Sequence, residues 1–240
     1  MSMELVVEHD GPVTLLTLNR PEKANALSPD LVEALLASVN EAYRDGTRLL
    51  VLSGNGQPFS SGFDFSDFEA AGEGELLRRF VRIEQLLQAL YHAPFAALGL
   101  AHGKNFGAGV DLLVACSVRV AAPDSSFRMP GLRFGVQLGT RRLAQRIGVE
   151  QARTMLAASK TVSAAHALSI GLVHRRTARD RWGEDIVAER SRATALGAAA
   201  AARLNAATAV DTRAADMADL VASLAEPGLP DRIRVFRERG

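Results

Sequence analysis

The stretch AHGKNFGAGVDLLVACSVRVA, residues 101–121, decides the fold that the sequence predicts. Its glycines at positions 103, 107 and 109 let the backbone turn tightly and approach a ligand closely. The apolar run Leu112 to Cys116 predicts a buried helix, and residues 117–121 predict a short strand. Asp111, at the start of the apolar run, is the only acid here. A glycine loop, a helix N-terminus with unpaired N–H groups and a lone carboxylate together indicate a site that can stabilise a carbonyl oxygen gaining negative charge.

Working outward from this stretch, the flanking residues predict alternating strands and helices. Ser28 before Pro29 indicates a helix start, because serine is a favoured N-cap and proline suits the first turn. A glycine-rich loop, residues 54–65, follows a buried strand, just as the loop of residues 102–107 does. The predicted strands are residues 4–8, 13–19, 48–53, 95–100 and 172–174, and the predicted helices include residues 75–91, 140–147, 149–158 and 163–168.

The composition is that of an ordinary globular enzyme: 240 residues, 48% apolar, 23% charged and a net charge of +1. A net charge this small gives no argument for nucleic acid or an anionic membrane as a partner. No apolar segment reaches the roughly 20 residues that span a bilayer, and the acidic N-terminus does not resemble a signal peptide. A single cysteine, Cys116, excludes a disulfide framework, and the histidines lack metal-ligand spacing. We therefore expect a cytoplasmic protein without a metal site.

The sequence pattern changes near residue 180. From Asp180 onward the chain is rich in alanine, arginine and aspartate, and the run Ala193 to Ala209 has high helix propensity. We interpret residues 1–178 as a mixed α/β core and residues 179–240 as a helical C-terminal region, with the run 193–209 as helix.

Four segments, in this order and spacing, resemble the crotonase (enoyl-CoA hydratase/isomerase) superfamily. They are NRPEKANALSPDLVEAL (19–35), VLSGNGQPFSSGFDF (51–65), the stretch from 101 to 127, and ASKTVSAAHALSIGLVHR (158–175). The resemblance implies an α/β fold, a crotonase-like spiral of repeated ββα units with a C-terminal α-helical region. It also implies a lyase or isomerase of fatty acid metabolism, a coenzyme A thioester as substrate, no permanently bound cofactor, and self-association as a homotrimer or hexamer.

The resemblance also assigns site residues. The family binds the thioester oxygen with two backbone N–H groups, which correspond here to Phe63 and Ala108, and the first catalytic acid corresponds to Asp111. The implied coenzyme-binding positions are Lys23, Ala24, Ala26, Ser61, Gly62 and Asp64.

The acids limit which reaction is possible. Family hydratases use two glutamates, but the first position holds Asp111 and the second holds Gly131. The following loop, before Arg141, is about three residues shorter than the family pattern. One acid can still take up and return a proton, which suffices for a double-bond shift and can assist decarboxylation or thioester hydrolysis. Non-catalytic binding of acyl-CoA is the remaining alternative. Burial should raise the pKa of Asp111.

Overall fold

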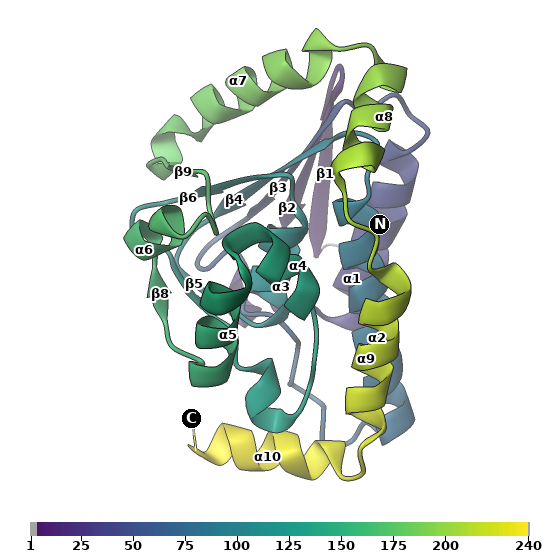
Figure 1. Ribbon diagram of the computed structural model, residues 1–240, viewed down its shortest axis with the longest axis vertical. Helices are drawn as coiled ribbons and strands as arrows, with labels where there is room; N and C mark the ends of the chain where they lie inside the picture. The colour runs from purple at the N-terminus through teal and green to yellow at the C-terminus, as the bar shows by residue number, and fades with distance from the viewer. Residues whose placement is uncertain (1–3, 240) are drawn as a thin grey trace.

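Two β-sheets organise the chain in the computed structural model, which describes residues 4–239 (Figure 1). The larger sheet has the strand order β1-β2-β3-β4-β6-β9 and the smaller has β5-β7-β8. Only the β1–β2 pair of the larger sheet is antiparallel. The strands are β1 (Leu5–Asp10), β2 (Val13–Leu18), β3 (Leu49–Gly54), β4 (Ala96–Ala101), β5 (Lys104–Phe106), β6 (Val118–Ala121), β7 (Ser126–Arg128), β8 (Val162–Ser163) and β9 (Arg175–Arg176).

Because β2, β3 and β4 are parallel neighbours, the loops that follow them leave from the same edge of the sheet. In open α/β sheets, ligands bind at this edge, beyond the carboxyl ends of the strands. These loops carry the three motifs of the predicted site: residues 19–27, 55–65 and 102–107.

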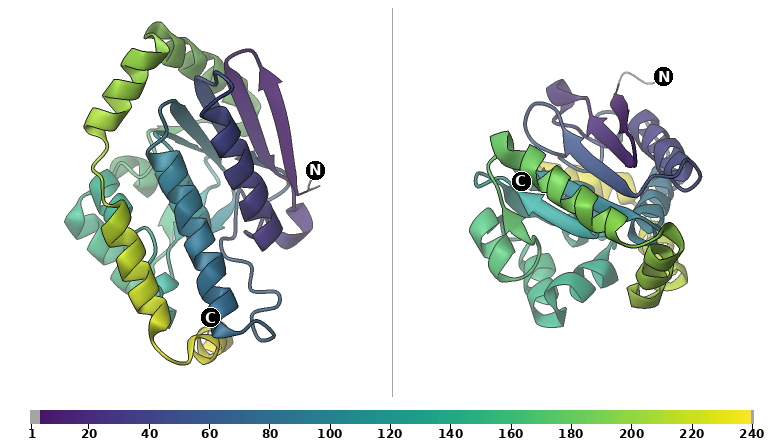
Figure 2. Two further views of the ribbon diagram at one scale, coloured as in Figure 1. Left: turned by 90° about the vertical axis from the view of Figure 1, so that its right-hand side faces the viewer. Right: turned by 90° about the horizontal axis from the view of Figure 1, so that it is seen from above.

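Helices cover both faces of the larger sheet and extend beyond it. α1 and α2 lie side by side, and α9 packs along α2 (Figure 2). Ser28 caps α1 as predicted, because its hydroxyl accepts a hydrogen bond from the Leu31 amide at 3.1 Å. The helices are α1 (Pro29–Ala42), α2 (Glu73–Tyr91), α3 (Ala108–Ala115), α4 (Thr140–Ile147), α5 (Val149–Ala158), α6 (Ala164–Ser169), α7 (Trp182–Ala195), α8 (Ala198–Thr208), α9 (Arg213–Ala225) and α10 (Leu229–Arg239).

The larger sheet separates two apolar clusters. The main core lies between the sheet and helices α1 to α5, and α3 is buried along its whole length. On the opposite face, α7 covers β3 and β4, and its Trp182 belongs to a second cluster that also contains Leu49 and Val51. The fold is thus the predicted mixed α/β architecture with a C-terminal helical region.

Two predicted elements are wrong in detail. Residues 172–174 form no strand: Leu172 and Val173 are apolar because they fill the core after α6, and β9 begins at Arg175. The run 193–209 is two helices rather than one, since Leu196 is extended and α8 starts after Gly197. No helix within residues 4–239 combines the length and the apolar composition needed to cross a membrane.

Candidate active site

Two glycines bring the loop after β3 against the start of α3. Gly62 has a φ of +87°, and a Cβ there would lie 2.4 Å from the Phe106 carbonyl oxygen and 3.1 Å from the Ala108 nitrogen. A Cβ on Gly109 would lie 2.5 Å from the Ser60 carbonyl oxygen. Side chains at either position would push the two segments apart, so both glycines are required by this close approach.

This approach brings two backbone amides to one cavity. Phe63 follows Gly62, and Ala108 is the first residue of α3, where the N–H has no helical partner. Neither amide has a hydrogen-bond acceptor among residues 4–239, and both residues line the same cavity. The two residues that the resemblance assigns to the thioester oxygen thus line one mostly apolar cavity, and their role stays a prediction.

The cavity has a volume of about 380 Å³ and a mainly apolar wall that includes several phenylalanines. The Phe63 and Phe80 rings stack at 4.2 Å between centroids, and Phe65 lies 4.9 Å from Phe63. Phe134 continues the chain of rings at 6.0 Å from Phe65, and Phe236 of α10 lies 5.1 Å from Phe134. The C-terminal region therefore helps to enclose this space, which suits an apolar ligand group.

Asp111 lies in the first turn of α3 and is 2% exposed. Its Oδ1 atom is buried and has no hydrogen-bond partner among the described residues. Gly139 lies directly against it, since a Cβ there would be 2.0 Å from Oδ1. Burial raises the pKa of Asp111 well above its usual value. The positive charge of Arg142 lowers this pKa, and the negative charge of Glu84 raises it, but burial is the largest effect. A buried carboxyl group with a raised pKa, facing a cavity, is a candidate for proton transfer.

Gly131, which the sequence resemblance aligns with the second family acid, also lines the cavity. The Val136 amide donates to the Gly131 carbonyl at 3.0 Å, and a Cβ on Gly131 would lie 2.9 Å from the Val136 carbonyl oxygen. The short loop thus folds back onto Gly131 and occupies the space of a side chain. The loop therefore leaves no room for a side chain at position 131.

We therefore expect Gly131→Glu to destabilise the protein without creating a hydratase. The new side chain must displace the Val136 carbonyl, and overpacking of this kind typically costs about 1–3 kcal/mol. Thermal melting should show a lower Tm, and assays with enoyl-CoA should show no gain in hydration. Gly183→Glu is the control, because nothing lies within 4 Å of a Cβ at that position of α7. A stable Gly131→Glu variant that hydrates enoyl-CoA would contradict this account.

The coenzyme-binding residues implied by the resemblance lie in three settings. Ser61 lines the cavity, and Gly62 lies beside the Ala108 amide. Lys23 is exposed on a short 3₁₀ turn, away from the cavity wall. The amides of Ala24 and Ala26 already donate to the Pro21 and Lys23 carbonyls. The Ala24 carbonyl accepts one hydrogen bond, from the Ser61 amide, so one of its lone pairs is left for a ligand. The Ala26 carbonyl already accepts from the Ser28 amide and from the Arg20 guanidinium, so it has none left.

Asp64 does not line the cavity, and its carboxylate is instead hydrogen-bonded to other residues of the protein. It accepts hydrogen bonds from the Arg20 guanidinium at 2.8 Å and from the Ser66 amide at 2.9 Å. Partial burial favours a raised pKa, but these hydrogen bonds outweigh it and the pKa of Asp64 is lowered. Asp64 therefore holds the loop in place through Arg20.

Sequence reasoning missed Asn25, which joins the loops of the site. It is fully buried with a φ of +51°, and its side-chain amide donates to the Asn55 and Pro58 carbonyls, both at 2.8 Å. Its own carbonyl accepts from the Ser60 hydroxyl at 2.8 Å. An asparagine between two alanines in a polar loop gave no sign of this role, although asparagine tolerates the left-handed conformation.

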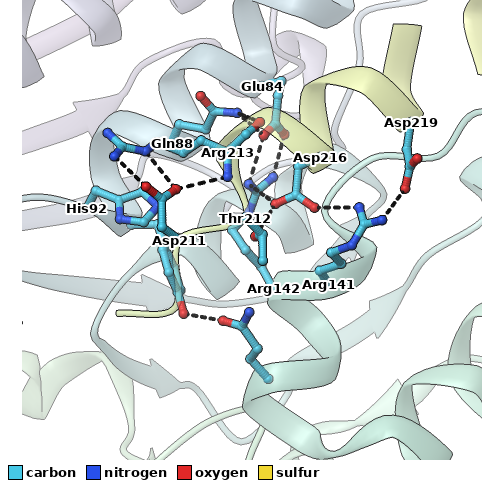
Figure 3. A network of polar contacts seen from close by, with 12 residues as sticks. Glu84, Gln88, His92, Arg141, Arg142, Asp211, Thr212, Arg213, Asp216 and Asp219 are labelled. Carbon is cyan, nitrogen blue, oxygen red and sulfur yellow. Dashed lines mark hydrogen bonds and ion pairs between the residues drawn. The ribbon is translucent and has the colours of Figure 1, made fainter. Parts of the chain in front are cut away.

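A buried ionic network, shown in Figure 3, was also missed. Arg142 of α4 pairs with both carboxylate oxygens of Glu84 on α2, and with Asp216 on α9 at 3.2 Å. Arg141 also binds Asp216, and it binds Asp219 at 2.7 Å. The network fixes α4, and so Gly139, relative to α2 and the C-terminal region. Charges in an amphipathic helix normally predict a solvated face, which hid it in the sequence.

Comparison with known proteins identifies the family. A family model described as enoyl-CoA hydratase/isomerase matches residues 8–225. The chain belongs to the enoyl-CoA hydratase/isomerase family. A Mycobacterium tuberculosis member named probable enoyl-CoA hydratase echA6 is 35% identical over 167 residues, which are 68% of this chain and 66% of that protein. A Bacillus subtilis member named probable enoyl-CoA hydratase is 31% identical over 169 residues, 68% of this chain and 65% of that protein. The match thus spans slightly less than two thirds of these two relatives.

Solved structures of the enoyl-CoA hydratase/isomerase family extend the match along the chain. A candidate enoyl-CoA hydratase/isomerase from Bordetella parapertussis superposes with a TM-score of 0.97 at 46% identity, over 98% of this chain and 99% of that one. A Mycobacterium smegmatis enoyl-CoA hydratase superposes with a TM-score of 0.80 at 27% identity, over 98% of this chain and 96% of that one. The family and the fold expected from the four sequence segments are confirmed.

Proposed function

We propose that this family member acts on acyl-CoA thioesters by forming an enolate, with Asp111 as the proton-handling group. The observation that carries the proposal is the setting of Asp111, a buried acid without a partner. It lines an apolar cavity that is also lined by Phe63 and Ala108, whose amides are unpaired in the described chain. Family membership supports a coenzyme A thioester as the substrate and no resident cofactor. No cluster of His, Cys, Asp or Glu within residues 4–239 is placed to hold a metal ion.

In the proposed reaction, the Asp111 carboxylate takes a proton from a carbon next to the thioester or conjugated with it. The electron pair of the broken C–H bond moves into the thioester, whose oxygen becomes negative. The Phe63 and Ala108 amides donate to that oxygen; removing one such donor from a known hydrolase costs about 2.7–4 kcal/mol. Asp111 then returns the proton to a different carbon, which shifts the double bond. A single acid completes this cycle, so the family's second acid is not needed.

The same proposal places the coenzyme along the loops at the carboxyl edge of the sheet. Lys23 offers an exposed ammonium group to a phosphate, and the Ala24 carbonyl offers a lone pair. Ala26 shapes this loop through its carbonyl, which accepts from Ser28 and Arg20. Ser61 and Gly62 lie where the thioester would enter the cavity, beside the two amides. Asp64 supports this loop through Arg20.

Proton exchange in D₂O tests the proposal directly. Enolate formation incorporates deuterium from solvent into an acyl-CoA or a β,γ-enoyl-CoA, and mass spectrometry and NMR locate the label. Free coenzyme A would identify a thioester hydrolase, and carbon dioxide would identify a decarboxylase. Calorimetric binding of acyl-CoA without deuterium incorporation or turnover would identify a non-catalytic binding protein. Any of these three outcomes would overturn the proposed double-bond shift.

We also propose self-association as a trimer or hexamer. The α7–α8 region supports it, because Val187, Leu196, Leu204 and Val210 are about half exposed or more. Exposed apolar residues in one region are typical of interfaces between subunits. Light scattering after size exclusion should give three or six times the monomer mass, and Leu204→Glu should lower that mass. A monomer at all concentrations would contradict the proposal. The cytoplasmic location stays a prediction.

A further inference from the structure

A second cavity lies beside the apolar cavity that holds Asp111. It has a volume of about 610 Å³, and its lining residues within the described chain fall in the ranges 128–135 and 226–236. Arg128, Phe134 and Phe236 line both cavities, and the two phenylalanine rings lie 5.1 Å apart. The two cavities therefore share a wall that contains an arginine.

The second cavity is rich in arginine. Its charged lining residues are Arg128, Arg133, Glu226, Asp231 and Arg232. Both acids are already paired, Glu226 with Arg232 at 3.2 Å and Asp231 with Arg234 at 2.7 Å. Arg128 and Arg133 have no acid partner among residues 4–239. Two positive charges of this cavity are thus not balanced by a neighbouring acid.

The C-terminal end of α5 holds both arginines by part of each guanidinium group. Arg128 donates from Nε to the Ser159 carbonyl at 2.9 Å, and Arg133 donates from Nη2 to the Ala158 carbonyl at 3.0 Å. Carbonyls at the end of a helix lack helical partners and often bind arginine. This capping does not use Nη1 and Nη2 of Arg128, which have no hydrogen-bond partner in the described part of the chain. These two nitrogens remain open to a ligand.

We infer that Arg128, assisted by Arg133, binds a second carboxylate at the far end of the acyl group, so the preferred substrates are thioesters of dicarboxylic acids. This assignment rests on the proposed function and names its substrate class. The carbon chain of such a substrate suits the apolar cavity, and its carboxylate matches the planar guanidinium group, which can donate two parallel hydrogen bonds.

Two alternatives have less support. A coenzyme phosphate is another anion of such a substrate, but none of the residues proposed for the coenzyme lines the second cavity. Arg237 also lines the apolar cavity, but it is exposed, and its guanidinium group lies over the Phe68 ring, 5.3 Å from the ring centre. Arg128 is half-buried and lies on the shared wall, which favours it as the carboxylate-binding residue.

Calorimetry with the full chain tests the inference with three ligands: a saturated dicarboxylyl-CoA, the monocarboxylyl-CoA of equal chain length, and free coenzyme A. We expect the wild type to bind the dicarboxylyl-CoA about ten-fold or more tightly than the monocarboxylyl-CoA, since hydrogen bonds between charged groups contribute that much. Arg128→Gln should lose this preference and keep its affinity for free coenzyme A. Arg128→Lys keeps the charge without the two-nitrogen geometry, so it should restore only part of the preference. Arg44→Gln is the control, because Arg44 is exposed and lies outside both cavities.

The outcomes separate the inference from the proposed function. Equal affinity of the wild type for the two thioesters overturns the inference, and this measurement needs no variant to fold. An Arg128→Gln variant that melts earlier but keeps the preference also overturns it, since Arg128 then only caps α5. Weaker binding of free coenzyme A by this variant would assign Arg128 to a phosphate instead. Preferential binding of the dicarboxylyl-CoA without deuterium exchange would support the inference and overturn the proposed function.

Discussion

Asp111→Asn is expected to lower turnover by about 10²–10⁴-fold and, at the same time, to raise the melting temperature. Turnover falls because the amide cannot take up a proton, and general acid–base catalysis commonly contributes a factor of that size. Stability rises because asparagine resembles the neutral acid that burial favours. For a chain of this length, each 1 kcal/mol gained raises the Tm by about 2–4 °C. Deuterium exchange and thermal melting measure the two effects.

The gain in stability should depend on pH with a definite sign. Folding raises the pKa of Asp111, so the unfolded chain loses this proton at a lower pH than the folded protein does. The wild type therefore loses stability, relative to the variant, as pH rises from the unfolded pKa of about 4 to the folded pKa. The Tm difference between variant and wild type should be small near pH 4 and widen toward neutral pH.

Asp64→Asn is the matched control, because folding lowers the pKa of Asp64 whereas it raises that of Asp111. The pKa of Asp64 is lowered by Arg20 and Ser66, so its contribution to stability is present above the unfolded pKa and lost as pH falls through the folded pKa. This variant should lose about 1–3 kcal/mol near neutral pH and lose less in acid. Unchanged turnover in Asp111→Asn, or equal Tm shifts in the two variants, would count against the assigned role of Asp111.

Ala108→Pro should reduce kcat by about 10²–10³-fold while the protein stays folded. Proline puts a ring carbon in place of the amide hydrogen, which has no acceptor in the described chain, and proline is well tolerated at the first position of a helix. The preceding residue, Gly107, has φ 46° and ψ −121°, a conformation outside the helical region that proline disfavours before it. Losing one donor to a developing oxyanion costs about this factor in a known hydrolase.

Val149→Pro is the control for the effect of a proline ring at the start of a helix. Val149 is the first residue of α5, is 53% exposed and lies outside the cavity wall. This variant should keep its circular dichroism spectrum, its Tm and its turnover. If Ala108→Pro is folded and as active as Val149→Pro, the Ala108 amide does not bind the reacting oxygen.

The sequence predicted the site's backbone better than its side-chain surroundings. Gly62, Gly109 and Asp111 could be identified because glycines and an isolated acid leave a clear pattern in the motifs. The sequence could not show why position 131 holds a glycine, since the reason is the position of the Val136 carbonyl after the loop folds back. The phenylalanines of the cavity are far apart in the chain, so only the folded structure brings their rings together.

The elements themselves show the same limit. Long periodic segments such as α2 were predicted closely, because the helical period of apolar residues extends over several turns. β5, β7 and β8 are two or three residues long, too short for any period to show, so the smaller sheet was not predicted. Leu172 and Val173 resembled a strand because core packing selects the same residue types.

The pairing of Arg142 with Glu84 and Asp216 bears on attempts to build chimeric enzymes from this scaffold. Composition suggests a cut near residue 178, but Asp216 lies beyond that junction and Arg142 before it. A transplanted tail that lacks an acid at this position would leave the guanidinium partly uncompensated in a dry interior, and breaking such a pair costs about 3–5 kcal/mol. Recombination between relatives should therefore succeed where the two residues are inherited together.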